Sequence, residues 1–310
     1  MTRILASAVL LATLTSLASA KIERDVERSF SVQPGMHLRA ATFGGNITVT
    51  SSSDAVVKVV AREHIRASND IEADDAVKKL ELTIEQHGNE IVATASYPTK
   101  MGFHMGDWPP VEVEFEISVP ADASVDLKTS GGDVVVENLQ GAVTAKTSGG
   151  DVKLGKIGGD INAETSGGNM SVVDGLAAVH FTTSGGNITA KHILGTAELK
   201  TSGGDIKIDS DEGTLSARTS GGDVKVGFDG SIKGDCVLST SGGQVKASVG
   251  KGVGFHIDAS TSGGEVEADG LTLTIDHGGV GKSNLSGAVN GGGPDLRLRS
   301  SGGDIEITTH

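Results

Sequence analysis

The sequence predicts an all-β fold: a single-stranded parallel β-solenoid, of the β-helix or β-roll kind, with coils of about 18 residues and a small N-terminal capping region. The first observation is a repeated Ser-Gly-Gly, usually preceded by threonine. Its steps are 18 residues five times, 21 twice and 39 once. The serines are Ser130, Ser148, Ser166, Ser184, Ser202, Ser220, Ser241, Ser262 and Ser301. A fixed period of about 20 residues indicates a solenoid, in which each repeat buries its apolar face against its neighbours.

The second observation is the alternation of apolar and polar residues on both sides of each Ser-Gly-Gly. Val143–Thr147 precedes one copy and Val152–Leu154 follows it. A period of two with β-branched residues predicts strands with one buried face. We expect the two glycines to form a tight corner through positive φ. A second glycine column marks the opposite corner, at Gly141, Gly159, Gly195 and Gly213.

The chain divides into three expected segments. Residues 1–20 form an export signal, because Arg3 precedes an apolar run that ends before the small residues Ala18-Ser19-Ala20. Residues 21–110 form an N-terminal β-rich cap with one short helix between Asn69 and Leu80, and Asn69 caps that helix. Residues 111–310 form the solenoid. The 39-residue step near its end predicts one degenerate coil between Ser262 and Ser301, with the glycine-rich stretch His277–Pro294 as an excursion from it. We therefore expect an exported protein, located in the periplasm, at the cell surface or outside the cell.

Composition narrows the classes of partner. The formal net charge of -14 disfavours nucleic acid and anionic lipid. Beyond the export signal, no apolar run approaches the length of a transmembrane helix. Cys236 is the single cysteine, so it forms no internal disulfide, and its register with Leu215 predicts a buried thiol.

Three columns of repeated residues could carry chemistry. The residue after Gly-Gly is usually Asp or Asn, which we expect to hydrogen-bond to its own corner. The calcium motif of β-rolls does not fit, because Asp follows Gly-Gly at once; calcium binding stays an open alternative. The threonine column has the parity of inward residues. The sequence shows no metal-binding spacing of histidine or cysteine, and we expect no cofactor and no metal.

The third column is the outward residue of the strand that follows each corner. Several coils place lysine there, although the protein is acidic. Either this is a solvated face that keeps the fold soluble or it is a docking surface. The candidate binding residues are Lys153, Lys207, Lys225 and Lys246.

The sequence also resembles a known family. Val111–Pro120, the repeated Thr-Ser-Gly-Gly-Asp-Val and the segment Gly291–Ile305 are similar to the bacterial DUF4097 family of adhesin-like proteins. The resemblance covers Gly35 to His310. It implies a β-solenoid in the bacterial envelope with a role in adhesion, and it brings no established catalytic residues.

We therefore expect a non-enzymatic cell-envelope protein with an adhesin-like binding or scaffold role through a repetitive solenoid face. Its partner would be a cell-surface polysaccharide or an envelope protein. One alternative is a carbohydrate-active β-helix enzyme with its site in the loops Met101–Pro110 or His277–Pro294. Minimal coils without long insertions argue against it. The other alternative is a structural spacer without a ligand.

Overall fold

The computed structural model describes residues 22–98, 109–230 and 232–310. The expected export signal at residues 1–20 lies outside the described residues, as does most of the loop Met101–Pro110. Within the described parts of the chain, no helix is long and apolar enough to cross a membrane.

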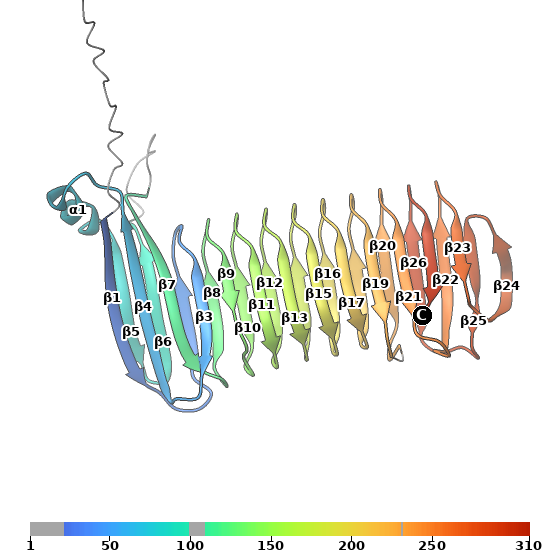
Figure 1. Cartoon of the computed structure of the whole chain (residues 1–310), viewed down its shortest axis with the longest axis horizontal. Coiled ribbons are helices and arrows are strands. Elements are labelled where there is room, and N and C mark those ends of the chain that lie inside the picture. Colours follow the sequence, from blue (N-terminus) through green and yellow to red (C-terminus); the bar gives the residue numbers. More distant parts are fainter. Residues whose placement is uncertain (1–21, 99–108, 231) are drawn as a thin grey trace, which may run out of the picture.

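Two long sheets face each other and form one elongated solenoid (Figure 1). Each central coil gives one strand to each sheet. In the 13-stranded sheet these are β9 (Val134–Val136), β11 (Val152–Ile157), β13 (Met170–Gly175), β15 (Ile188–Ile193), β17 (Ile206–Asp211), β19 (Val224–Phe228) and β21 (Val245–Val249). In the 14-stranded sheet they are β8 (Ser124–Lys128), β10 (Val143–Lys146), β12 (Ile161–Glu164), β14 (Val179–Thr182), β16 (Thr196–Lys200), β18 (Thr214–Arg218) and β20 (Cys236–Thr240).

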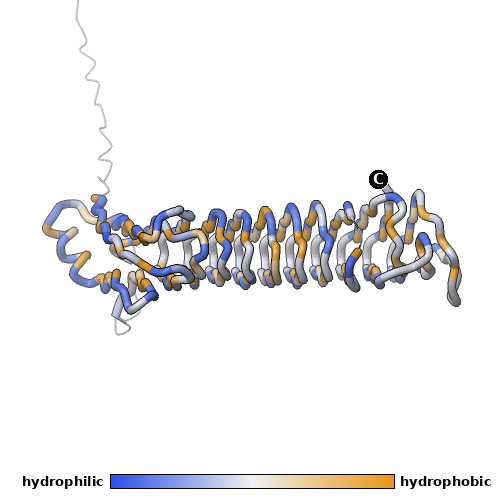
Figure 2. The backbone as a smooth tube through the Cα atoms, turned by 90° about the horizontal axis from the view of Figure 1, so that it is seen from below, coloured by the Kyte–Doolittle hydropathy of each residue, from blue (hydrophilic) through white to orange (hydrophobic). Residues whose placement is uncertain are grey.

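The central strands are parallel and in the register that the repeat predicts. Val152 of β11 pairs with Met170 of β13, and Met170 pairs with Ile188 of β15, so equivalent residues stack in columns. Hydrophobic and hydrophilic residues alternate along the coils (Figure 2). The predicted parallel β-solenoid is confirmed.

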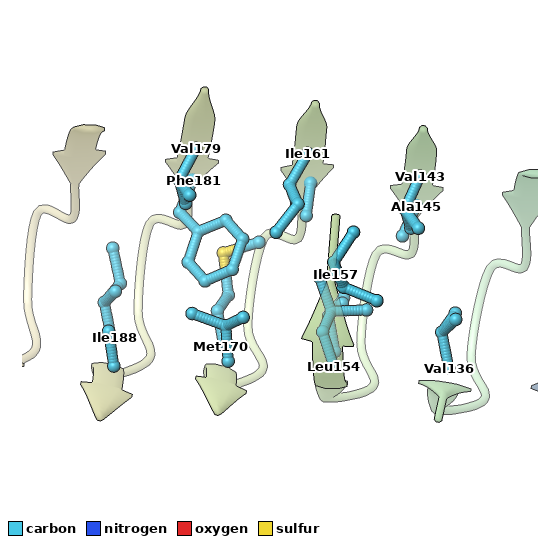
Figure 3. Packing of buried hydrophobic residues seen from close by; sticks show 14 of the residues in the cluster. Val136, Val143, Ala145, Leu154, Ile157, Ile161, Met170, Val179, Phe181 and Ile188 are labelled. Carbon is cyan, nitrogen blue, oxygen red and sulfur yellow. The ribbon is translucent and has the colours of Figure 1, made fainter. Parts of the chain in front are cut away.

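The core is the narrow space between the sheets. Figure 3 shows side chains from both sheets pointing toward one another, with Phe181 of β14 beside Met170 of β13. Both side chains are buried. Cys236 is also buried, as predicted, and burial raises the pKa of its thiol to about 12. The thiol is therefore protonated at neutral pH, as an inert core group.

The Ser-Gly-Gly corners have a different physical basis from the one the sequence suggests. None of their glycines has positive φ among the described residues, so the prediction of positive φ was wrong. Their second glycine is required for space instead. A Cβ on Gly150 would lie 2.0 Å from the carbonyl oxygen of Gly132 in the preceding coil. Coils stacked at strand spacing leave no room for a side chain at this point.

The N-terminal region closes one end of the solenoid. β1 (Ile22–Ser31), β4 (Val56–Ile65) and β7 (Val111–Pro120) form antiparallel pairs, and β7 also pairs in parallel with β3 (Ile47–Ser52). On the other sheet, β5 (Glu81–His87) and β6 (Glu90–Ser96) form the hairpin that precedes β2 (His37–Ala41) in spatial order. Helix α1 (Asp70–Val77) confirms the predicted helix, because the side chain of Asn69 accepts a hydrogen bond from the backbone of Glu72.

The opposite end departs from sequential stacking. β22 (Phe255–Thr261) and β23 (Val266–Asp269) form one coil, and β24 (Leu273–Gly281) and β25 (Asn284–Val289) form an antiparallel hairpin against β22. The chain then returns, and β26 (Asp295–Ser300) and β27 (Ile305–Thr309) lie between the two preceding coils. We call residues 295–309 the inserted coil. The 39-residue step thus contains an excursion, as expected, but it is a hairpin; the prediction of a degenerate parallel coil there was wrong.

Candidate functional site

Three of the four candidate lysines lie side by side on the outer face of the 13-stranded sheet. Lys207 on β17 pairs in register with Lys225 on β19, and Lys225 pairs with Lys246 on β21. The inserted coil continues this row with Glu306 on β27. Stacked strands hold these positions about 4.8 Å apart. The result is a short row of cations along the solenoid axis.

Lys153 lies apart from this row. It is on β11, and the outward residues of β13 and β15, Ser171 and Thr189, separate it from Lys207. Its ammonium group lies 3.0 Å from Asp133 and 3.4 Å from Asp151. The hydrogen bond to Asp133 raises the pKa of Lys153. Two carboxylates therefore neutralise this lysine.

The lysine row borders a groove of about 480 Å³, which we call the lysine groove. Gly227 contributes no side chain in the middle of it, between its register partner Ser248 and the neighbouring Asp209. The charged and polar side chains that line the groove are Lys207, Asp209, Lys225, Asp229, Lys246, Ser248, Glu306, Thr308 and His310. The groove therefore combines residues from three sequential coils and from the inserted coil.

The charges in the lysine groove are unequally compensated. Lys207 lies 2.7 Å from Asp209, and Lys246 lies 2.7 Å from Glu306. The hydrogen bond to Glu306 is the main cause of the raised pKa of Lys246. Lys225, between them, forms no ion pair with any residue that the structure describes. The centre of the row is thus an exposed cation that an external anion can reach.

A connected set of polar side chains at the edge of the groove was not predicted from the sequence. Ser248 Oγ lies 2.9 Å from His310 Nδ1, and His310 Nε2 lies 3.1 Å from Asp229 Oδ1. Ser248 lies on β21, Asp229 lies in the turn after β19, and His310 follows the inserted coil, so spacing in the sequence could not reveal them. A hydrolytic triad holds its acid in a buried position. Here the side chains of Asp229 and His310 are 59% and 48% exposed, so these contacts instead connect the end of β27 to β21 at the surface.

The Asp and Asn column after the corners forms a hydrogen-bond ladder between coils. The Asp133 carboxylate accepts a bond of 2.8 Å from the backbone N–H of Asp151, and Asp151 accepts one from Asn169. The expectation that each side chain bonds to its own corner was therefore wrong. Within the described residues, no group of His, Cys, Asp and Glu is arranged to hold a metal ion.

The threonine column lies inside the corner, in agreement with its parity. Thr147 is buried and donates to the carbonyl of Gly132 in the preceding coil, at 2.9 Å. Its hydroxyl also accepts from the backbone N–H of Gly150. This column therefore satisfies buried backbone groups, and it is unavailable to a ligand.

The chain is distantly similar to several solved structures. A search of curated proteins found no match. Among solved structures, the chain is similar to a candidate adhesin from Bacteroides fragilis, at 13% identity and a TM-score of 0.39, over 93% of this chain and 97% of that chain. A candidate adhesin from Parabacteroides distasonis is 11% identical, with a TM-score of 0.38 and the same coverage. A candidate cell adhesion protein from Clostridium sporogenes is 12% identical, with a TM-score of 0.23, over 93% of this chain and 100% of that chain.

A family model gives the decisive comparison. The model of the Toastrack DUF4097 family matches residues 41–308, which includes every coil of the solenoid and most of the N-terminal region. The chain belongs to the Toastrack DUF4097 family.

Proposed function

We propose that this chain is a non-enzymatic, adhesin-like protein of the bacterial envelope, exported by residues 1–20, that binds an acidic cell-surface polysaccharide in the lysine groove. The observation that carries this proposal is the in-register row of Lys207, Lys225 and Lys246, in which Lys225 has no ion pair among the described residues.

A polymer suits this site better than a small molecule. The groove is open and its cations are spaced by one strand, which matches a chain that carries an acidic group on successive sugars. Each exposed cation contributes little, on the order of 1 kcal/mol, so affinity must come from several contacts along the polymer. The protein is acidic overall, with a net charge of -14, and a polyanion is repelled from most of its surface. The lysine row would then orient the polymer along the solenoid.

The proposal is tested by co-sedimentation of the chain from residue 21 onward with insoluble acidic polysaccharide and with isolated envelope fractions. Reversing one unpaired charge converts an attraction into a repulsion, so Lys225→Glu should weaken binding roughly tenfold at low salt. The matched control is Lys200→Glu, since Lys200 is an exposed outward lysine on the other sheet.

Three results would change the proposal. Equal binding by the wild type, Lys225→Glu and Lys200→Glu would move the binding site away from the groove. Binding to envelope fractions but not to polysaccharide would favour an envelope protein as partner. No binding to either material would favour the structural spacer.

A further inference from the structure

The inserted coil occupies a slot between two other coils. β26 pairs in parallel with β20 on one side and with β22 on the other, and β27 pairs in the same way with β21 and β23. Its inward side chains Leu296, Leu298, Ile305 and Ile307 are completely buried. The slot is therefore bounded by two complete coils, residues 236–249 and 255–269, and the inserted coil fills the space between them.

The contacts within the slot are those of every other coil junction. Ser300 on the inserted coil donates to the carbonyl of Gly243 at 2.9 Å, and Thr261 donates to the carbonyl of Gly303 at 2.8 Å. Backbone pairing, corner hydroxyls and apolar columns hold the coil in place. None of these contacts requires that the occupant belong to the same chain as the walls.

The linker that leads into the slot is short and conformationally restricted. Residues 290–294 connect β25 to β26, which lie on opposite sides of β22, so the linker spans about 10 Å across the start of β22. Asn290, Gly291 and Gly292 have φ of 47°, 91° and 84°. Asn290 is the non-glycine residue with positive φ in the described chain. Short, strained linkers of this kind favour the exchange of an element between copies.

We propose that the inserted coil is exchangeable, so that two copies of this chain pair by each placing residues 295–309 in the slot of the other. The single-chain form and the exchanged dimer make the same contacts in the slot. They differ in the conformation of residues 290–294 and in the entropy lost on association. The two forms are therefore close in free energy at high protein concentration.

Exchange would also make the lysine groove a composite site. Glu306, Thr308 and His310 line the groove together with Lys225 and Lys246. In the exchanged dimer, the first three belong to one copy and the two lysines belong to the other. The proposal does not rest on the proposed function, because the slot and its linker are independent of any ligand.

The first test shortens the linker in the otherwise full chain. Deletion of Gly291–Gly293 leaves two residues between Val289 and Asp295, which reach about 11 Å when fully extended and cannot pass over the backbone of β22. We expect this variant to be a dimer by light scattering at concentrations where a matched variant with three added glycines is monomeric. A folded, monomeric deletion variant with an unchanged unfolding midpoint would overturn the proposal.

The second test covers a deletion variant that does not fold. A protease site replaces Gly291–Gly293 in the full chain, the folded protein is cut there, and a labelled peptide of residues 294–310 is added. The labelled peptide should replace the resident coil, whereas a peptide with Leu298→Asp should not. Failure of the unmodified peptide to enter, or equal entry of both peptides, would contradict exchange.

Discussion

At the scale of single residues, this fold depends on partners for the polar groups that stacking buries. Thr165 shows the usual solution: its hydroxyl donates to the carbonyl of Gly150 and accepts from the N–H of Gly168. Asp211 is the exception. It is buried at a position that pairs with Ile193, and neither of its carboxylate oxygens makes a hydrogen bond of normal geometry in the described structure.

Thr165→Val should destabilise the solenoid by about 1–3 kcal/mol, because it leaves a buried carbonyl and a buried N–H without their hydroxyl partner. Unfolding in urea measures this change. The matched control is Thr144→Val, an outward and partly exposed threonine, which should alter stability by less than about 0.5 kcal/mol. Equal effects of the two substitutions would show that the corner hydroxyls are dispensable.

The burial of the Asp211 carboxyl group leads us to expect that the stability of the protein depends on pH. Burial raises the pKa of its carboxyl group to about 7; the nearby Gly213 amide offsets part of this rise, and the Glu212 carboxylate adds to it. The folded protein then holds a proton that the unfolded chain releases near pH 4, so stability falls as the pH rises from about 4 to about 7. Above pH 7 the full penalty is present, on the order of 4 kcal/mol.

The test compares wild type with Asp211→Asn by urea unfolding between pH 4.5 and 8. Asparagine keeps the shape and cannot ionise, so the advantage of the variant should grow with pH and level off above pH 7. Groups that titrate independently of position 211 are common to both proteins and cancel in the difference. A difference that stays constant over this range would mean that Asp211 does not titrate there.

At the scale of the element, the two glycines of each corner have different roles. A Cβ on Gly168 would lie 1.8 Å from the carbonyl oxygen of Gly150, whereas a Cβ on Gly167 would meet its nearest atom at 3.8 Å. We therefore expect Gly168→Ala to destabilise the protein by about 3 kcal/mol or more. Gly167→Ala should change stability by less than about 1 kcal/mol. Thermal unfolding of both variants tests this, and similar melting temperatures would contradict the steric account.

Much of the coil could be predicted from its pattern. Alternation around Ser-Gly-Gly gave the strands, their parity and the inward threonines, because a period of two leaves one face buried. The reason for the glycines could not be predicted, since positive φ and close coil spacing select the same residue. The order in which the coils stack could not be predicted from the sequence either. Every coil offers the same apolar columns, so the repeat does not say that β26 lies between β20 and β22.

The lysine groove shows the same limit. The row of Lys207, Lys225 and Lys246 follows from the repeat, and all three were predicted as candidate binding residues. Ser248 and His310 could not be predicted as part of the groove, because only the position of the inserted coil brings His310 to it. Lys153 shares the column but lies three strands from Lys207, and only the structure reveals its two carboxylate partners.

At the scale of the whole molecule, the solenoid is an elongated rod with a short row of lysines on the outer face of its 13-stranded sheet, within an acidic protein. Binding of a polyanion to this row should weaken as salt rises, because exposed charges about 10 Å apart are screened at 0.1 M salt. A sedimentation series between about 0.02 and 0.3 M salt measures this effect. Salt-independent binding would indicate apolar or hydrogen-bonded recognition elsewhere on the rod.

The most direct measurement is chemical acetylation of the lysines, read by mass spectrometry, in the presence and absence of acidic polysaccharide. It locates the contact without a mutation. Our account predicts that the polysaccharide protects Lys225 most, protects Lys207 and Lys246 as well, and leaves Lys200 on the opposite sheet unchanged. Uniform labelling of all lysines, or protection of Lys200 in place of Lys225, would contradict the lysine groove as the binding site.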